Sequence, residues 1–105
     1  MPQYQEYFVQ LLGTRCGWPE NMTADEERVM SEHFEYLKEL TTRGKVLVAG
    51  PVLEKVFGLV VLRTADKEEA VALMENEPSV KQGVHTYRIY PMRVSLLARN
   101  HPSGD

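Results

Sequence analysis

The chain has 105 residues, of which 43% are hydrophobic and 26% charged, and its net charge is −3 at pH 7. This length and composition describe one globular domain and exclude a disordered or fibrous chain. The slightly acidic balance gives no electrostatic reason to expect a nucleic acid or an anionic membrane as partner. Cys16 is the single cysteine and cannot close a disulfide within the chain, and the N-terminal residues lack the pattern of a secretory signal. We therefore expect a cytoplasmic protein with no membrane span.

The first third of the chain predicts a strand followed by a helix. Aromatic and branched residues at 7–12 are typical of a strand, and the Gly- and Pro-containing stretch 13–22 reads as a loop. Residues 23–26 have the pattern of a capping box, which begins a helix that continues to about residue 42. Gly44 is placed to close this helix in the left-handed conformation.

Two further strands come next. Residues 45–49 predict a second strand, and we expect Gly50 and Pro51 to end it. Residues 56–64 predict a third strand that is apolar on both faces, as is typical of a strand covered on both sides.

The last part of the chain predicts a helix and a strand. Asp66 begins the helix in a second capping pattern, and Pro78 is expected to stop it after Glu77. Residues 84–98 predict a long fourth strand. Pro91 lies inside it, and because proline cannot donate to a ladder, this strand is either an edge strand or changes partner there.

The order strand, helix, strand, strand, helix, strand predicts an α+β fold of the ferredoxin-like βαββαβ type, with a four-stranded antiparallel sheet. We expect residues 1–99 to form this single domain and residues 100–105 to be a flexible tail. Two helices cover one face of such a sheet, so the other face would be an apolar patch too large for a monomer. A homodimer through the sheet face, a dimeric α/β-barrel assembly, is the simplest remedy.

His33 and Glu77 stand at positions where the two predicted helices should carry apolar residues. The helical spacing places His33 on one face with Val29 and Leu37, and Glu77 on one face with Ala70. An ionisable group on a packed face needs a partner, because desolvating its charge costs several kcal/mol. If both helices lie on one sheet, the imidazole and the carboxylate can satisfy each other and form a dyad that handles protons.

Each of these residues also has a purely structural interpretation. His33 can be a core histidine that donates one ring N–H and does nothing else, and Glu77 can be a helix-end carboxylate that reaches solvent. No spacing typical of a zinc site and no Gly-rich phosphate loop occurs, so we expect neither a metal nor a cofactor. The thiol of Cys16 has no base near it in the sequence and is not expected to be a nucleophile.

Several stretches resemble the YCII-related (YciI-like) family. They are HFEYL at 33–37, GKVLVAGP at 44–51, GLVVL at 58–62 and the segment from Glu69 to Pro78, and the likeness extends over nearly the whole domain. The resemblance implies a small dimeric α+β barrel built from ferredoxin-like chains. Most members have no established reaction, and a few relatives act on breakdown products of chlorinated aromatics or lactones.

The resemblance also implies which residues form the site. The family pattern pairs a histidine with the aspartate of an Asp-Pro-Phe motif, and His33 and Glu77 are the matching positions here. This chain departs from the pattern, since it has Glu-Pro-Ser at 77–79. Glutamate is one methylene longer, so its carboxylate still reaches an imidazole with a different aim.

These observations lead to a functional hypothesis and a rival. The hypothesis is cofactor-free proton transfer, of the isomerase or lyase and dehalogenase type, on a small cyclic or aromatic organic acid, with His33 and Glu77 as the catalytic dyad. The rival is a ligand-binding or regulatory interaction module without catalysis. Candidate substrate-binding residues are Gly50, Pro51, Tyr7 and Arg88, although strand termination, interface packing and plain exposure explain these residues equally well.

Overall fold

The computed structural model describes residues 4–98 and shows four strands and three helices in this range. They are β1 (Gln5–Gly13), α1 (Ala24–Thr42), β2 (Val46–Val52), β3 (Phe57–Thr64), α2 (Lys67–Glu75), α3 (Pro78–Lys81) and β4 (His85–Met92). All strands pair antiparallel in the order β2-β3-β1-β4, which confirms the expected ferredoxin-like sheet. No helix in this range is both long and apolar enough to span a membrane.

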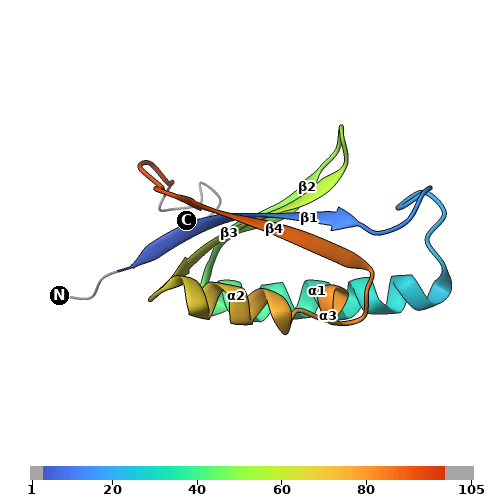
Figure 1. Ribbon diagram of the computed structural model, residues 1–105, viewed down its shortest axis with the longest axis horizontal. Helices are drawn as coiled ribbons and strands as arrows, with labels where there is room; N and C mark the ends of the chain where they lie inside the picture. The colour runs from blue at the N-terminus through green and yellow to red at the C-terminus, as the bar shows by residue number, and fades with distance from the viewer. Residues whose placement is uncertain (1–3, 99–105) are drawn as a thin grey trace, which may run out of the picture.

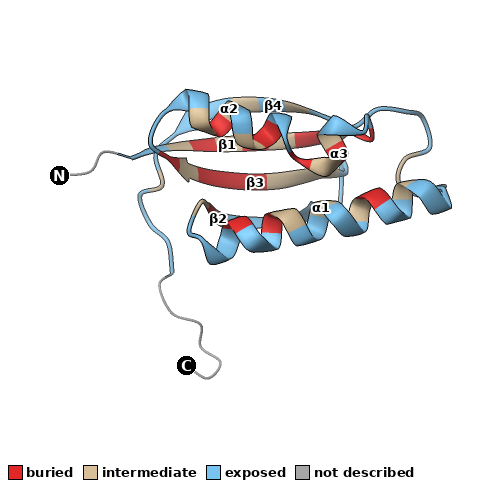
Figure 2. Ribbon diagram, turned by 90° about the horizontal axis from the view of Figure 1, so that it is seen from below, coloured by how far each residue is buried: buried red, intermediate tan, exposed pale blue. Residues whose placement is uncertain are grey.

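The three helices lie on one face of the sheet, and the other face is bare (Figure 1). Seen from the helical side, α2 crosses over the sheet while α1 runs along its other border (Figure 2). The capping box predicted at the start of α1 is present: Thr23 Oγ1 accepts from the Glu26 N–H, and the Glu26 carboxylate accepts from the Thr23 N–H. Gly44 follows α1 with φ +77°, so it occupies the left-handed position expected of it.

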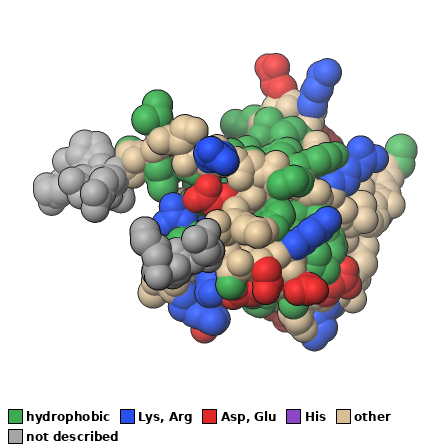
Figure 3. Space-filling view, turned by 60° about the vertical axis from the view of Figure 1, so that its left-hand side comes forward, with side chains coloured by type: hydrophobic (Ala, Val, Ile, Leu, Met, Phe, Trp, Pro, Cys, Tyr) green, Lys and Arg blue, Asp and Glu red, His purple; other side chains and the backbone are tan. Residues whose placement is uncertain are grey.

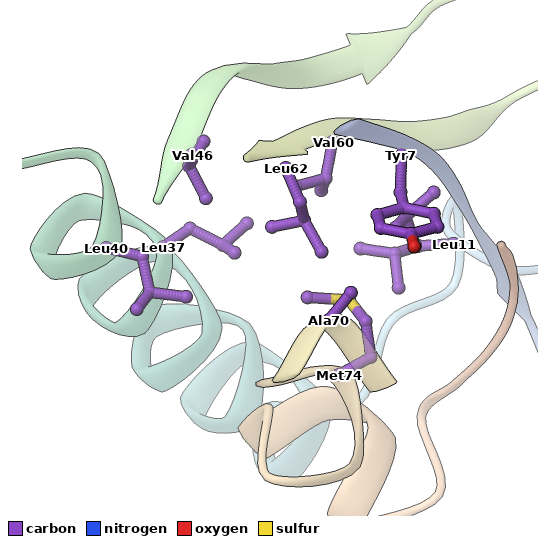
Figure 4. Close-up of a cluster of buried hydrophobic side chains, with 10 residues drawn as sticks. Tyr7, Leu11, Leu37, Leu40, Val46, Val60, Leu62, Ala70 and Met74 are labelled. Carbon is purple, nitrogen blue, oxygen red and sulfur yellow. The ribbon is translucent and has the colours of Figure 1, made fainter. Parts of the chain in front are cut away.

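The hydrophobic core lies between the sheet and the helices (Figure 4). Leu62 on β3 is fully buried at its centre, opposite Tyr7 on β1 and Val46 on β2. Met74 of α2 and Leu37 of α1 close the core from the helical side. The alternation along the strands sends one set of side chains into this core and the other to the bare face.

The predicted break at Gly50 and Pro51 is wrong. Strand β2 continues to Val52, with Gly50 opposite Leu59 and Pro51 opposite Gly58 of β3. Because β2 is an outer strand, it has a sheet neighbour on one side only, and a proline in such a strand need not end the ladder.

The predicted helix over residues 66–77 is in fact two helices. Helix α2 ends at Glu75, and Asn76 caps it. Glu77 then has extended backbone (φ −68°, ψ 129°) and is the N-cap of α3, whose first residue is Pro78. Proline is tolerated in a first helical turn, where its missing N–H has no helical partner to lose, so Pro78 begins a helix as well as ending one.

The fourth strand is shorter than predicted. It ends at Met92, and residues 93–98 belong to no helix or strand, although the Val94 N–H donates to Glu6 Oε1 at 2.9 Å. Pro91 lies in this strand, which is an outer strand of the sheet, one of the two expectations for it. The predicted tail at 100–105 lies outside the described residues.

The bare face of the sheet carries aromatic and branched side chains. Phe8 on β1 stacks on Tyr90 of β4, with ring centroids 5.9 Å apart, and meets Phe57 edge-on at 6.4 Å. Tyr90 is 44% exposed. Hydrophobic side chains gather along the upper side of the molecule, above the sheet (Figure 3).

We expect Leu62→Ala to lower the free energy of unfolding by about 2–5 kcal/mol, because it leaves a cavity at the centre of the core. Leu53→Ala is the matched control, since Leu53 is 80% exposed in the β2–β3 turn and should change stability by less than about 0.5 kcal/mol. Urea denaturation of both variants measures the difference, and equal losses would contradict the assignment of Leu62 to the core.

Candidate functional site

His33 reaches the site from the middle of α1. It stands on the packed side of the helix, between the buried residues Val29 and Leu37, and α1 passes α3 at this point. Its side chain is 15% exposed, so one edge of the imidazole is packed while the other remains open.

Glu77 is fully buried and holds its place by capping α3. Its Oε1 accepts from the Ser79 N–H at 2.6 Å, and its Oε2 accepts from the Ser79 Oγ–H at 3.0 Å. The same Oε2 lies 2.5 Å from Nδ1 of His33. The structure therefore brings the two predicted dyad residues together, although Glu77 arrives from a helix N-cap and not from a helical stripe.

A second histidine joins this group. Nδ1 of His85, the first residue of β4, lies 2.8 Å from Ser79 Oγ. The His85 and His33 rings are 5.5 Å apart between centroids, and the ring of Trp18 meets His85 edge-on at 5.6 Å. Four polar side chains thus form one connected cluster, in the order His33, Glu77, Ser79, His85.

Counting donors and acceptors assigns the protons in this cluster. A carboxylate only accepts, so both His33 Nδ1–H and Ser79 Oγ–H donate to Glu77. The serine hydroxyl has a single proton, so its oxygen accepts from His85 Nδ1–H. In both neutral rings Nε2 is then the unprotonated nitrogen, which is the arrangement that a carboxylate-oriented base requires.

His85 is the one histidine of the pair with a resolved change in basicity. Burial lowers the pKa of His85 from 6.5 to about 4, and the neighbouring His33 lowers it further, while Glu77 opposes both effects. Near neutral pH the His85 ring is uncharged.

The two imidazoles line a cavity of about 830 Å³. Its walls come from α1, from the β2–β3 hairpin and from the loop between β1 and α1, and they are mostly apolar. Among the described residues that line it, Lys38 is the one lysine or arginine, and no carboxylate lines it. The cavity therefore suits a small, largely apolar molecule that offers hydrogen-bond donors to histidine.

Trp18 forms part of the cavity wall by lying against Gly13. A Cβ at Gly13 would stand 2.2 Å from Cδ1 of Trp18, so only glycine leaves room for the indole ring. Arg15 holds the same loop to α1 through paired hydrogen bonds to Glu26, and these bonds lower the pKa of Glu26 to about 2. Cys16 in this loop is exposed and does not line the cavity.

The four residues predicted to bind substrate divide into two pairs. Gly50 and Pro51 line the cavity on the β2 side. Tyr7 does not, because it is 3% exposed in the core and its hydroxyl donates to Gln5. Arg88 does not either, because the alternation along β4 places its side chain on the bare face of the sheet. Neither residue has a place in this cavity.

Ser79 and His85 are the site residues that the sequence interpretation missed. The alternation of β4 contains a signal for His85, since His85 shares the inner face with Tyr87 and Ile89. No comparable signal marks Ser79, because its role depends on a short helix that the sequence pattern did not predict. Within residues 4–98, no group of three His, Cys, Asp or Glu side chains is arranged to hold a metal ion.

Comparison with solved structures places the fold among proteins of known structure. 5-Chloro-2-hydroxyhydroquinone dehydrochlorinase from Burkholderia phenoliruptrix AC1100, in complex with 2,5-dihydroxybenzoquinone, is similar at a TM-score of 0.64 and 20% identity, over 83% of this chain and 93% of that one. An uncharacterized protein from Thermotoga maritima is similar at a TM-score of 0.53 and 13% identity, over 87% of this chain and 100% of that one. At these identities the likeness concerns the fold.

Comparison with sequences gives the family. No curated protein matches the sequence. The model of the YCII-related domain matches residues 16–93, which contain the whole cluster from His33 to His85. The chain belongs to the YCII-related family.

Proposed function

We propose that this chain is a proton-transfer enzyme of the isomerase or lyase type that acts on a small cyclic or aromatic organic acid, phenols included. The observation that carries the proposal is the contact of His33 Nδ1 with the buried Glu77 carboxylate at the wall of an apolar cavity. That contact leaves His33 Nε2 as the free basic nitrogen, and it has no hydrogen-bond partner among the described residues.

The proposed chemistry needs only movement of a proton. His33 Nε2 takes a proton from an acidic C–H or O–H of the ring compound, and Glu77 stabilises the imidazolium that forms. If the proton returns at another atom, the reaction is an isomerisation. If the electron pair instead expels chloride, the substrate loses H⁺ and Cl⁻, so the reaction is an elimination that needs no oxidant or reductant.

The similar dehydrochlorinase favours the elimination branch. Its name states that it removes HCl from a chlorinated hydroxyhydroquinone, and its fold matches over most of both chains. The exposed single cysteine agrees with action in a reducing compartment, so we place the proposed reaction in the cytoplasm. A non-catalytic binding module would use the same cavity, and it is the competing outcome of the experiment below.

The test is turnover of 5-chloro-2-hydroxyhydroquinone by wild-type protein and by His33→Gln. We expect chloride release, followed with an ion-selective electrode, to fall by about 10²- to 10⁴-fold in the variant, because glutamine cannot take the proton. Glu35→Gln is the matched control, since Glu35 is exposed on the same helix. Unchanged release in His33→Gln would refute the dyad. Binding without release or ring-hydrogen exchange in D₂O, by wild-type protein, would leave a binding module.

Glu77→Gln tests the carboxylate separately. The glutamine keeps the side-chain length and an oxygen for the Ser79 N–H, but it presents an NH₂ to His33 and favours the tautomer with Nε2 protonated. We expect turnover to fall by about 10²- to 10⁴-fold while the chain still folds, by analogy with the effect of a wrong histidine tautomer in other enzymes. Glu68→Gln, on the exposed side of α2, should keep the wild-type rate, and equal rates in both variants would contradict an orienting role for Glu77.

We further propose that the active form is a homodimer that covers the bare face of the sheet. The support is the row of aromatic and branched side chains on this face, which no helix covers within residues 4–98. A second copy would bury the same patch from both sides around a two-fold axis.

Sedimentation equilibrium should give twice the mass of one chain for the wild type. Tyr90→Lys places a charge in the centre of the aromatic row and should shift the protein toward the monomer, whereas Glu68→Lys on the helical side should not. A monomeric wild type would contradict the proposed dimer.

A further inference from the structure

We infer that His85 is a second functional imidazole of the cavity, whose unprotonated Nε2 accepts a hydrogen bond from the ligand. The site then takes an uncharged ring with at least two hydroxyl groups, one for His33 and one for His85. This inference deepens the proposed function, on which it rests for the role of His33.

The geometry behind it is the connection through Ser79. The buried Ser79 hydroxyl gives its one proton to Glu77 and receives the Nδ1–H of His85 at 2.8 Å. The His85 ring is therefore fixed with Nδ1 protonated and bound. Its Nε2 has no partner among the described residues and is not sealed from solvent, and the residue lines the cavity.

The surroundings of His85 keep the ring uncharged. Each neighbouring element contributes one group: His33 on α1, Glu77 and Ser79 at the start of α3, and the edge of Trp18 from the loop. Burial and the His33 ring oppose protonation, and Glu77 compensates only in part, which agrees with the pKa of about 4. Lys38 is the charged residue of the cavity lining, and its cation also disfavours a second positive charge.

The two imidazoles consequently have different roles. His33 contacts the carboxylate directly, so its protonated form is compensated and it can act as a base. A hydroxyl separates His85 from the same carboxylate, so His85 keeps its lone pair and acts as a substrate-positioning acceptor.

The lone pair of His85 also discriminates between ligands. A hydroxyl group donates to an unprotonated nitrogen, whereas a carboxylate presents only acceptors and would face the lone pair without a proton between them. No arginine lines the cavity among the described residues, so a carboxylate would have Lys38 as its one cationic partner. Dihydroxylated rings should therefore bind better than benzoate.

The first arm of the test needs no substrate. NMR of protein with ¹⁵N-labelled histidine should show His85 as the neutral tautomer protonated at Nδ1, both at about pH 8 and at about pH 6, where an ordinary histidine is mostly protonated. Ser79→Ala removes the acceptor for Nδ1–H and should bring the Nε2–H tautomer into the spectrum. A His85 ring that is protonated at about pH 6, or that carries its proton on Nε2 in the wild type, would overturn the inference.

The second arm measures binding of catechol, resorcinol, hydroquinone, phenol and benzoate by NMR titration. At least one dihydroxybenzene should bind more tightly than phenol, and His85→Phe should weaken it about tenfold while changing the phenol affinity by less than about twofold. His85→Gln, which places an amide near the former Nε2, should restore part of the loss. Equal weakening of all ligands, or none, would contradict a specific acceptor role.

The two arms separate this inference from the proposed function. If no reaction is found but His85 is neutral and discriminates dihydroxybenzenes from phenol, the enzyme proposal fails and the ligand site stands. If His33→Gln abolishes chloride release while His85→Phe neither changes discrimination nor alters KM, the dyad stands and the role of His85 is refuted.

Discussion

The buried carboxylate of Glu77 is the constraint on which both the local fold and the candidate chemistry depend. A fully buried charge costs several kcal/mol unless hydrogen bonds replace the lost water. Three donors do so here: the Ser79 N–H, the Ser79 hydroxyl and His33 Nδ1. Because these donors come from two helices, the need to satisfy one carboxylate fixes how α1 and α3 meet.

The same contacts explain why a four-residue helix is present at all. Isolated helices of this length are unstable, since nucleation is costly and few hydrogen bonds repay it. In this chain Glu77 caps the first turn, Pro78 supplies a preset φ angle, and the Val84 N–H bonds back to Ser79. Helix α3 is thus held by its side-chain partners, and a change at Glu77 alters the geometry of the site and the order of this turn together.

The sequence was sufficient to predict the fold and the pairing of His33 with Glu77, and the physical reasons are clear. The capping box at Thr23 and the left-handed Gly44 are local signals, and an ionisable residue on a packed face demands a partner. The α2–α3 division was not predictable from periodicity, because Pro78 reads equally well as an end and as a beginning. The sequence also gave no basis for finding Ser79, whose function exists only once β4 brings His85 to it.

One atom decides the difference between the two imidazoles. Both rings use Nδ1 toward the same carboxylate, but His33 contacts it directly and His85 reaches it through a hydroxyl oxygen. A hydroxyl passes on a hydrogen bond without passing on a charge, so the carboxylate compensates an imidazolium at His33 far better than one at His85. A second carboxylate in place of Ser79 would give two competing bases, whereas the serine gives one base and one fixed acceptor facing the same cavity.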